Sequence, residues 1–519
     1  MNLLGASLIA SFPWLLAAAL CFALAAATRP RRTDAVGLFA LTVATFVGRT
    51  LLMPARFFHQ NGQGPLWVER ALHGVFREYG PGLMELFHGA IALRPRDPEG
   101  AVFLVQSLLA APGPACAWLI ARRVGADRPL AAALALAIAL DPMLARLARS
   151  ESYFGTGAAL LLLAAGALSL RATRAPVTSA PFVFASLAAG AVVAQVARLH
   201  PLLWPAAALT PLVLLAGDGA LRRRVRAAAA AGALIAAVVA VVAGRSMWAA
   251  LHSDLAARFS PNGEWGTAAR LAVWFPRLVP VWVLAVALAR RRFAAAWRAL
   301  LVVPVVAVVV AADFPAASRL AAWVEGGYLR LYAAALVVLC AALLRDVARS
   351  RWQSYAVALC GAALILGPVA VRHRSDRVVP TDALEQELAR SWRRLVPAHS
   401  SVVWLGQTDP CTLRLPLYPR ADPDLREIRP IEASRLRHSL AGYRAERIYY
   451  YRSSLCSTWT GAAACDDVER RGGLTLLRAW TLPAVESYSV PYNTAAVRVA
   501  LYRVDGGSAP RLDRATGAR

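Results

Sequence analysis

The sequence predicts an α-helical polytopic membrane protein with about twelve transmembrane helices, followed by a C-terminal extracytoplasmic α/β domain. The chain of 519 residues is 58% hydrophobic and has a mean hydropathy of +0.48, so it carries more apolar side chain than soluble domains bury. Long runs of Ala, Leu and Val are nearly free of charge. After Val371 the composition changes abruptly to mixed charge. Lipid is therefore expected to surround the first part of the chain.

The hydrophobic runs are long enough to cross a bilayer of about 30 Å as helices. We expect helices at 3–27, 35–53, 99–121, 129–147, 154–170, 180–198, 201–217, 227–244, 271–289, 299–312, 328–344 and 354–371. The first run lacks a basic leading segment and is followed by arginines, so it is interpreted as a retained helix and not a signal peptide.

Basic residues alternate between the loops and predict which loops face the cytoplasm. The formal net charge is +26, and short arginine clusters follow every second hydrophobic run, which is the positive-inside pattern. These clusters are Arg29/Arg31/Arg32, Arg122/Arg123/Arg128, Arg171/Arg174, Arg222–Arg224/Arg226, Arg290–Arg292/Arg298 and Arg345/Arg349/Arg351. Because no basic stripe is interleaved with aromatics on a soluble module, nucleic acid is excluded as a partner. Both termini are then expected outside the cytoplasm.

Three longer segments face outward in this arrangement. In the first, 54–98, apolar residues at helical spacing predict an amphipathic helix in the membrane interface; they are Val68, Ala71, Leu72, Val75 and Phe76. The second, 245–270, carries tryptophans typical of the aromatic belt. The third is the whole tail. The predicted domains are therefore a transmembrane domain at 1–371, an extracytoplasmic domain at 372–505 and a disordered end at 506–519.

Helix and strand patterns alternate in the tail, which favours a small α/β domain. We expect helices at 381–395 and 464–471 and strands at 401–405, 447–451, 474–480 and 497–504. The tail also holds Cys411, Cys456 and Cys465. In an oxidising compartment these predict one disulfide and one free thiol, and the sequence does not choose the pair.

Short motifs along residues 35–215 resemble those of a known class of membrane enzymes. They are Tyr79-Gly80-Pro81-Gly82, Ala139-Leu140-Asp141-Pro142, Arg149-Ser150-Glu151-Ser152-Tyr153 and Arg198-Leu199-His200-Pro201. In order and spacing they resemble integral membrane glycosyltransferases of the GT-C type, in a divergent form. The layout is similar to that of protein O-mannosyltransferases and lipid-A aminoarabinose transferases.

The resemblance implies a membrane glycosyltransferase of the plasma (inner) membrane. It would move a hexose or pentose from a polyprenyl-phosphate donor to a lipid, glycan or protein acceptor of the cell envelope. Such a reaction needs a carboxylate to take the acceptor's proton and cations to hold the leaving phosphate. The substrate-binding residues it implies are Asn61, Tyr79, Arg149, Glu151, Arg198 and His200.

The first outward loop departs from the pattern of the class, whose members commonly carry an Asp early in this loop. Residues 59–65 read HQNGQGP, and the first carboxylate is Glu69. Either Glu69 or Glu78 is then the catalytic base, or the chain is a non-catalytic membrane scaffold or binding protein. A secondary transporter is a further alternative, although two similar halves are not evident.

Each charged candidate also has a structural interpretation. Glu69 could pair with His73 one turn along a helix, and Glu151 could anchor neighbouring loops. Asp141 could pair with Arg146, and Arg198 and His200 could mark the membrane boundary by snorkelling.

A metal site in the first outward loop is a further possibility. Glu85 and His88 have a helical i, i+3 spacing that can converge on an ion, and His59 and His73 share the loop. A divalent cation is thus a possible cofactor, and no residue is assigned as a metal ligand.

Overall fold

The computed structural model describes most of the helical region and the core of the tail. Its described residues are 32–52, 63–76, 80–95, 98–216, 220–252, 330–347, 381–392, 395–397, 400–405, 424–428, 447–459, 461–470, 473–485 and 492–505, with single positions in 15–23 and 352–355. The chain divides into two compact units. The first comprises 1–54 and 70–377, and the second comprises 55–69 and 378–519.

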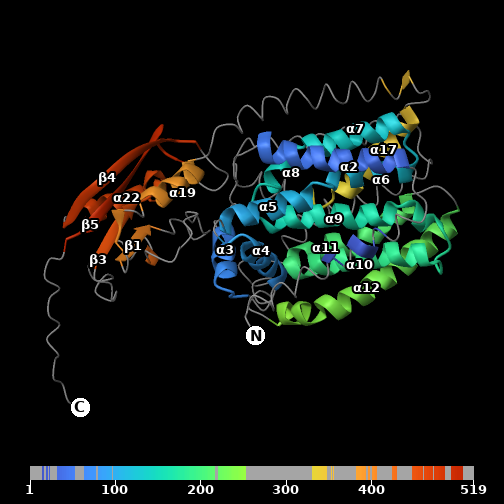
Figure 1. The fold of residues 1–519 in the computed structure, drawn as a ribbon, viewed down its shortest axis with the longest axis horizontal. Coiled ribbons are helices and arrows are strands. Elements are labelled where there is room, and N and C mark those ends of the chain that lie inside the picture. Colours follow the sequence, from blue (N-terminus) through green and yellow to red (C-terminus); the bar gives the residue numbers. More distant parts are fainter. Residues whose placement is uncertain are drawn as a thin grey trace, which may run out of the picture. The chain divides into compact units, whose positions relative to one another are not determined.

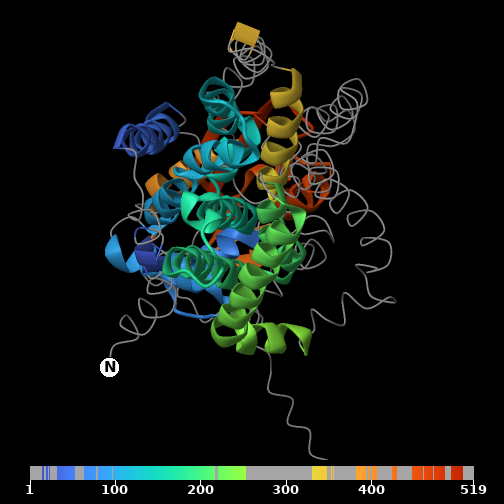
Figure 2. The same ribbon diagram turned by 90° about the vertical axis from the view of Figure 1, so that its right-hand side faces the viewer.

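The first unit is a bundle of helices (Figure 1). Its described helices are α2 (Arg32–Val47), η1 (Gly48–Leu52), α4 (Pro81–Leu93), α5 (Pro98–Ala110), α6 (Gly113–Val124), α7 (Arg128–Leu140), α8 (Pro142–Leu147), α9 (Tyr153–Ser169), η2 (Arg171–Arg174), α10 (Ala180–Leu199), η3 (Pro201–Leu203), α11 (Trp204–Ala208), η4 (Thr210–Ala216), α12 (Leu221–Leu251) and α17 (Ala333–Val347). Helix α9 lies in the interior, where nearly all of its side chains are buried, and the neighbouring helices surround it (Figure 2).

Arginines gather at one end of this bundle, which we call the arginine end. Arg123 is buried and donates to the Leu168 carbonyl and the Thr173 hydroxyl, while Arg345 donates to the Val124 carbonyl. Arg174, Arg223 and Arg224 likewise donate to backbone carbonyls. These acceptors lie at or near the ends of helical segments, where carbonyls lack intrahelical partners. Basic clusters that are far apart in sequence thus stabilise one end of the bundle.

The hydrophobic pattern located most of the described helices. Three helical stretches are long and apolar enough to cross a membrane, namely α5 together with α6 (Pro98–Val124), α10 (Ala180–Leu199) and α12 (Leu221–Leu251), and shorter apolar helices accompany them. The predicted runs at 3–27, 271–289, 299–312 and 354–371 lie mostly or wholly outside the described residues, so the total of twelve stays a prediction.

Two predicted helices are wrong as continuous elements. The run at 201–217 is divided into η3, α11 and η4, because Pro201, Pro205 and Pro211 cannot donate the hydrogen bonds of a continuous helix. The run at 129–147 is broken at Asp141 into α7 and α8. In the first outward loop, helix α3 (Gln63–Leu72) ends before the expected Val75 and Phe76, and a left-handed Gly74 follows it.

The second unit contains a five-stranded mixed sheet (Figure 1). Its order is β2-β1-β3-β5-β4, formed by β1 (Ser400–Leu405), β2 (Asp424–Ile428), β3 (Arg447–Arg452), β4 (Leu474–Pro483) and β5 (Ala496–Val504). Strand β1 is parallel to β2 and β3, whereas β5 is antiparallel to β3 and β4. The helices α19 (Thr381–Trp392) and α22 (Ala462–Arg470) match the two expected helices. Only β2 among these strands was not expected.

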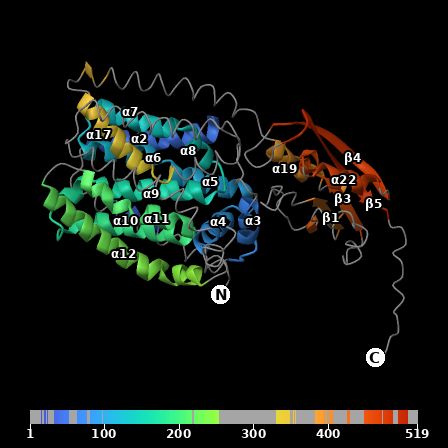
Figure 3. The same cartoon turned by 180° about the vertical axis from the view of Figure 1, so that it is seen from behind.

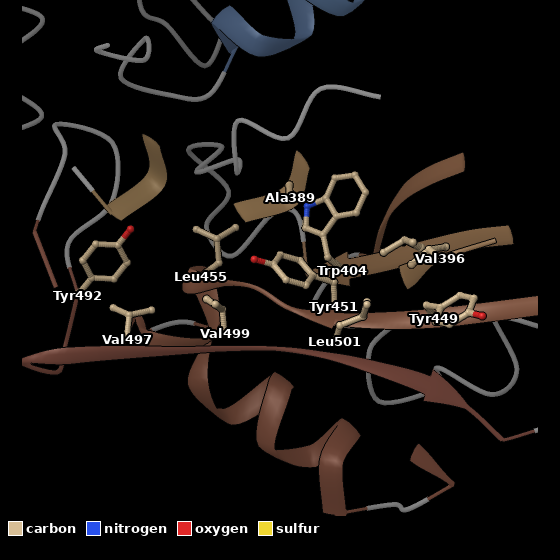
Figure 4. Close-up of a cluster of buried hydrophobic side chains, with 11 residues drawn as sticks. Ala389, Val396, Trp404, Tyr449, Tyr451, Leu455, Tyr492, Val497, Val499 and Leu501 are labelled. Atoms are coloured by element: carbon tan, nitrogen blue, oxygen red, sulfur yellow. The ribbon is translucent and has the colours of Figure 1, made fainter. Parts of the chain in front are cut away.

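Each face of this sheet carries a hydrophobic core. One core joins Trp404, Tyr451 and Leu501 to Ala389 of α19 (Figure 4). The other contains Val403, Tyr450 and Tyr502 with Cys465 and Val468 of α22. A disulfide joins Cys456 to Cys465, which resolves the pairing that the sequence left open. The alternating side chains of the strands thus supply both layers, and the sheet is also seen from behind in Figure 3.

Candidate functional site

The start of α4 packs tightly against the end of α10. A Cβ on Gly80 would lie 2.7 Å from the Leu199 carbonyl oxygen, and one on Gly82 would lie 2.9 Å from Cβ of Arg198. Gly80 also has a φ of 64°, in the left-handed region. Gln195 donates to the Gly82 carbonyl at 3.3 Å. Two glycines around Pro81 therefore allow the first outward loop to approach α10 backbone to backbone.

This approach places Glu85 of α4 against Arg198 of α10. One guanidinium nitrogen of Arg198 donates to both carboxylate oxygens of Glu85, at 2.8 and 2.6 Å. The two side chains are only 11% and 10% exposed. Buried charges are costly unless they are paired, so this ion pair ties the two helices together. The snorkelling interpretation is wrong for Arg198, because its side chain is turned into the protein.

His200 directly follows α10 and stacks on Tyr153, the first residue of α9. The ring centroids are 4.3 Å apart and the planes differ by 7°. Tyr153 is buried and His200 is partly buried. Two of the motifs singled out in the sequence, at 149–153 and 198–201, are therefore in direct contact.

The segment between α8 and α9 is held by polar side chains of α5. Ser107 donates to the Ala148 carbonyl at 3.1 Å, and Gln106 donates to the Ser152 carbonyl at 3.4 Å. Within this segment Glu151 is completely buried, with 0% exposure, and Arg149 is partly buried. A carboxylate buried this deeply at the edge of an apolar bundle is a feature of functional sites.

Asp141 lies at the break between α7 and α8. Its carboxylate accepts from the Leu144 amide at 2.7 Å, as an N-cap of α8, and from Nη2 of Arg330 at 2.7 Å. Nε of Arg330 donates to both carboxylate oxygens as well. The suggested pairing with Arg146 is thus replaced by an ion pair with a residue 189 positions away.

Arg49, on η1, lies close to the Asp141–Arg330 ion pair. It donates to the carbonyls of Ala110 and Ile138, each at 3.2 Å, and to that of Ala139 at 3.4 Å. Asp141 also attracts it electrostatically. We call Arg49, Asp141 and Arg330 the junction clamp. It lies in the same half of the bundle as Glu151 and Arg198, opposite the arginine end, and we call this half the site end.

The remaining sequence candidates are only partly placed. Glu69 lies on α3, whereas Asn61, Glu78 and Tyr79 lie outside the described residues. Sequence reasoning did not select Arg49 or Arg330. The available signal was a single arginine inside or at the start of an expected hydrophobic helix, which is costly in lipid and therefore informative.

The arrangement of Glu85 does not favour the suggested metal site. Both of its carboxylate oxygens accept from Arg198. His88, one turn later, lies against the Ala71 carbonyl through Nδ1. Within the described ranges, no group of three or more His, Cys, Asp and Glu side chains gathers in a way that could hold a metal ion.

A second buried polar cluster lies in the second unit. Oε1 of Glu385 on α19 accepts from the Ser454 amide at 2.8 Å and from the Tyr451 hydroxyl at 2.9 Å. Asp382 is buried on the same helix, and the Tyr492 hydroxyl reaches Ser454. Burial raises the pKa of Glu385 to about 7, the hydrogen bonds from Ser454 and Tyr451 oppose this, and nearby Asp382 adds to it.

The fold and the site together define a class of protein: a polytopic helical bundle with buried ion pairs at one end and an α/β unit after it. No protein-family model matches the chain, and no curated protein matches its sequence.

Solved structures of membrane glycosyltransferases are similar to the chain. The archaeal oligosaccharyltransferase AglB from Archaeoglobus fulgidus, in complex with an inhibitory peptide and a dolichol-phosphate, is 12% identical with a TM-score of 0.47, over 90% of this chain and 76% of that one. ArnT from Cupriavidus metallidurans is 13% identical with a TM-score of 0.43, over 90% and 97%. The arabinofuranosyltransferase AftD from Mycobacteria is 14% identical with a TM-score of 0.46, over 92% of this chain and 40% of that one. All three are GT-C glycosyltransferases, the class that the sequence motifs resemble.

Proposed function

We propose that the chain is a membrane glycosyltransferase whose site end takes a sugar from a polyprenyl-phosphate donor and transfers it to a cell-envelope acceptor. The observation that carries this proposal is the group of buried charges at that end. Glu85, Arg198, Arg330, Arg49 and Glu151 are buried, and the side chain of Asp141 is only 16% exposed. Charges inside an apolar bundle are costly and are retained mainly where they serve a function.

Arginine is suited to the phosphate of such a donor. Arginine stays charged inside a protein, and its planar guanidinium can donate two parallel hydrogen bonds to phosphate oxygens. Arg149 is partly exposed beside the buried Glu151, so we assign it to the phosphate. Arg198 is already held by Glu85, and we assign this pair to shaping the site together with the stacked His200 and Tyr153.

Glu69 and Glu78 are proposed as the candidates for the catalytic base, with Asn61 and Tyr79 contacting the substrate. A carboxylate is required because Asn and Gln cannot accept the acceptor's proton at neutral pH. The proposed location is the plasma membrane, with the second unit outside the cytoplasm. The disulfide between Cys456 and Cys465 supports that side, because disulfides persist in oxidising compartments.

The early part of the first outward loop favours a second candidate function. No carboxylate occurs between His59 and Pro65, so the chain could bind a lipid-linked sugar without transferring it. In that case it would act as a membrane scaffold or binding protein.

Sugar transfer by the full chain in lipid nanodiscs tests both functions. The assay supplies undecaprenyl-phosphate hexoses and pentoses with a cell-envelope extract as acceptor. We expect Glu69→Gln or Glu78→Gln to lower transfer at least 100-fold, because the base is lost. Glu387→Gln, on an exposed position of α19, is the matched control and should transfer as the wild type does.

The outcomes separate the candidates. Unchanged transfer in both Glu69→Gln and Glu78→Gln would overturn their assignment as bases. A wild-type chain that binds undecaprenyl phosphate but transfers no sugar would support the scaffold function.

A further inference from the structure

We propose that Arg49, through the end of α7, and Arg330, through Asp141, are positioning residues, which hold the Arg149–Glu151 segment in place for the lipid-phosphate donor. This inference rests on the proposed function. Its structural basis is the junction clamp at the break between α7 and α8.

The break leaves backbone polar groups inside the bundle without helical hydrogen bonds. Pro142 has no amide hydrogen, so α7 ends at Leu140 and α8 starts anew at Pro142. The last carbonyls of α7 and the first amides of α8 then lack intrahelical partners. In an apolar environment each unsatisfied group is strongly unfavourable. A break of this kind persists only when other parts of the chain supply partners.

Arg49 supplies partners to the carbonyl side of the break. Its guanidinium donates to Ile138 and Ala139 in the last turn of α7, and it also donates to Ala110 at the end of α5. The side chain is only 5% exposed. Arg49 therefore joins the ends of two helices to η1.

Asp141 supplies a partner to the amide side, and Arg330 holds Asp141. The carboxylate caps the Leu144 amide, and Arg330, whose side chain is 2% exposed, donates to both of its oxygens. A carboxylate in this environment needs a charged partner. Without Arg330 the same oxygens would lose two donor groups, and the cap of α8 would be weakened.

A short path links the clamp to the Arg149–Glu151 segment. Helix α8 is six residues long, and Ala148–Ser152 follows it directly. Ser150 and the start of α9 rest on Leu147, since a Cβ on Gly155 would lie 2.3 Å from the Leu147 carbonyl oxygen. Movement of α8 would therefore move Arg149 and Glu151.

The test compares two variants of the same region of the chain. Arg330→Met removes the guanidinium that holds Asp141 in the clamp. Arg345→Met removes an arginine of α17 at the arginine end, which donates to Val124. Amide hydrogen exchange of the full chain in nanodiscs is measured by mass spectrometry, and binding of undecaprenyl phosphate is measured on the same samples. Arg330→Lys is the conservative variant, because lysine keeps the positive charge but lacks the planar guanidinium that can donate to both carboxylate oxygens.

We expect Arg330→Met to raise exchange in residues 142–152 and to weaken undecaprenyl phosphate binding at least 10-fold, with partial recovery in Arg330→Lys. Arg345→Met should raise exchange near Val124 and leave the affinity unchanged. Unchanged exchange at 142–152 in Arg330→Met would overturn the clamp. Raised exchange with wild-type affinity would overturn the positioning role. If the wild type does not bind undecaprenyl phosphate, the donor assignment fails, while the exchange data still decide the clamp.

Discussion

The ionisation of Glu385, in the second unit, is expected to affect stability. One carboxylate oxygen receives two hydrogen bonds, from Ser454 and Tyr451, while Oε2 is buried and has no hydrogen-bond partner among the described residues. A proton on Oε2 removes the buried charge and leaves both of these hydrogen bonds in place. The neutral acid therefore fits this site better than the carboxylate, in agreement with the pKa of about 7.

This predicts a pH-dependent stability with a definite sign. The folded pKa is about 7 and the unfolded value is 4.5, so the folded state binds the proton more tightly. The free energy of unfolding should then be highest below about pH 4.5 and should fall as the pH rises to about 7. This group contributes up to ~3 kcal/mol to that decrease, and above about pH 7 its contribution no longer changes.

Glu385→Gln tests this directly, because Gln keeps an acceptor oxygen and cannot ionise. We expect the variant to be more stable than the wild type at pH 8 and nearly equal to it at pH 5, as measured by amide exchange protection in β3 of the full chain. Glu387→Gln, on the exposed side of α19, should show no such difference. A variant that is less stable at pH 8 would show that Glu385 is needed as a carboxylate.

The sequence identified individual charged residues better than it identified their partners. Glu85, Arg198 and Asp141 stood out as charges in or beside apolar runs. However, Glu85 was associated with His88 and Asp141 with Arg146, because only near neighbours can be paired from one sequence. The observed partners are 113 and 189 residues away. Such pairs depend on helix packing, which the pattern of a single chain does not specify.

Close helix contacts depend on glycine at the element scale. The start of α9 meets the end of α8 where a Cβ on Gly155 would lie 2.3 Å from the Leu147 carbonyl oxygen and 2.9 Å from its carbon. Backbone atoms cannot move aside to make room for a Cβ, as the end of a flexible side chain can. A Cβ on Gly244 in α12, by contrast, would meet no atom within 4 Å among the described residues outside its own stretch of helix.

We therefore expect Gly155→Ala and Gly244→Ala to have opposite effects on stability. Alanine favours helix over glycine by roughly 1 kcal/mol, so Gly244→Ala should leave the unfolding temperature unchanged or raise it. Gly155→Ala should destabilise the chain by about 2 kcal/mol, because overpacking outweighs this gain. Thermal unfolding of both variants in the same detergent is the measurement. Equal effects would mean that the α8–α9 contact is not close in solution.

Elements with a clear period were predicted well, and elements shaped by local chemistry were not. The tyrosine-rich strand β3 and helix α22 lie within two residues of their expected bounds. Strand β2, with the sequence DLREI, was missed because charged residues occupy three of its five positions. The region 201–217 was assigned to one helix from its hydrophobicity alone, although its prolines divide it.

At the scale of the whole molecule, the arginine end predicts the orientation in the membrane. Its basic clusters are expected on the cytoplasmic side by the positive-inside rule, and the site end is then expected outside. Arg226 is exposed near the start of α12 at the arginine end, and His252 is exposed after its last turn.

Cysteine labelling would check this orientation. An impermeant maleimide applied to right-side-out vesicles should modify the His252→Cys variant and leave the Arg226→Cys variant unmodified, as mapped by peptide mass spectrometry. Inverted vesicles should give the reverse result. Labelling of Arg226→Cys from outside would invert the proposed topology and place the site end on the cytoplasmic face.

The junction clamp also bears on how the chain is assembled during synthesis. Arg49, Ala110 and Asp141 emerge from the ribosome early, whereas Arg330 follows Asp141 by 189 residues. Until the segment with Arg330 joins the bundle, Asp141 lacks the guanidinium that donates to both of its carboxylate oxygens. The early helices can insert before then, but the Arg149–Glu151 segment is held in place only at a late step. Chains truncated before Arg330 would thus be inserted without a completed junction clamp.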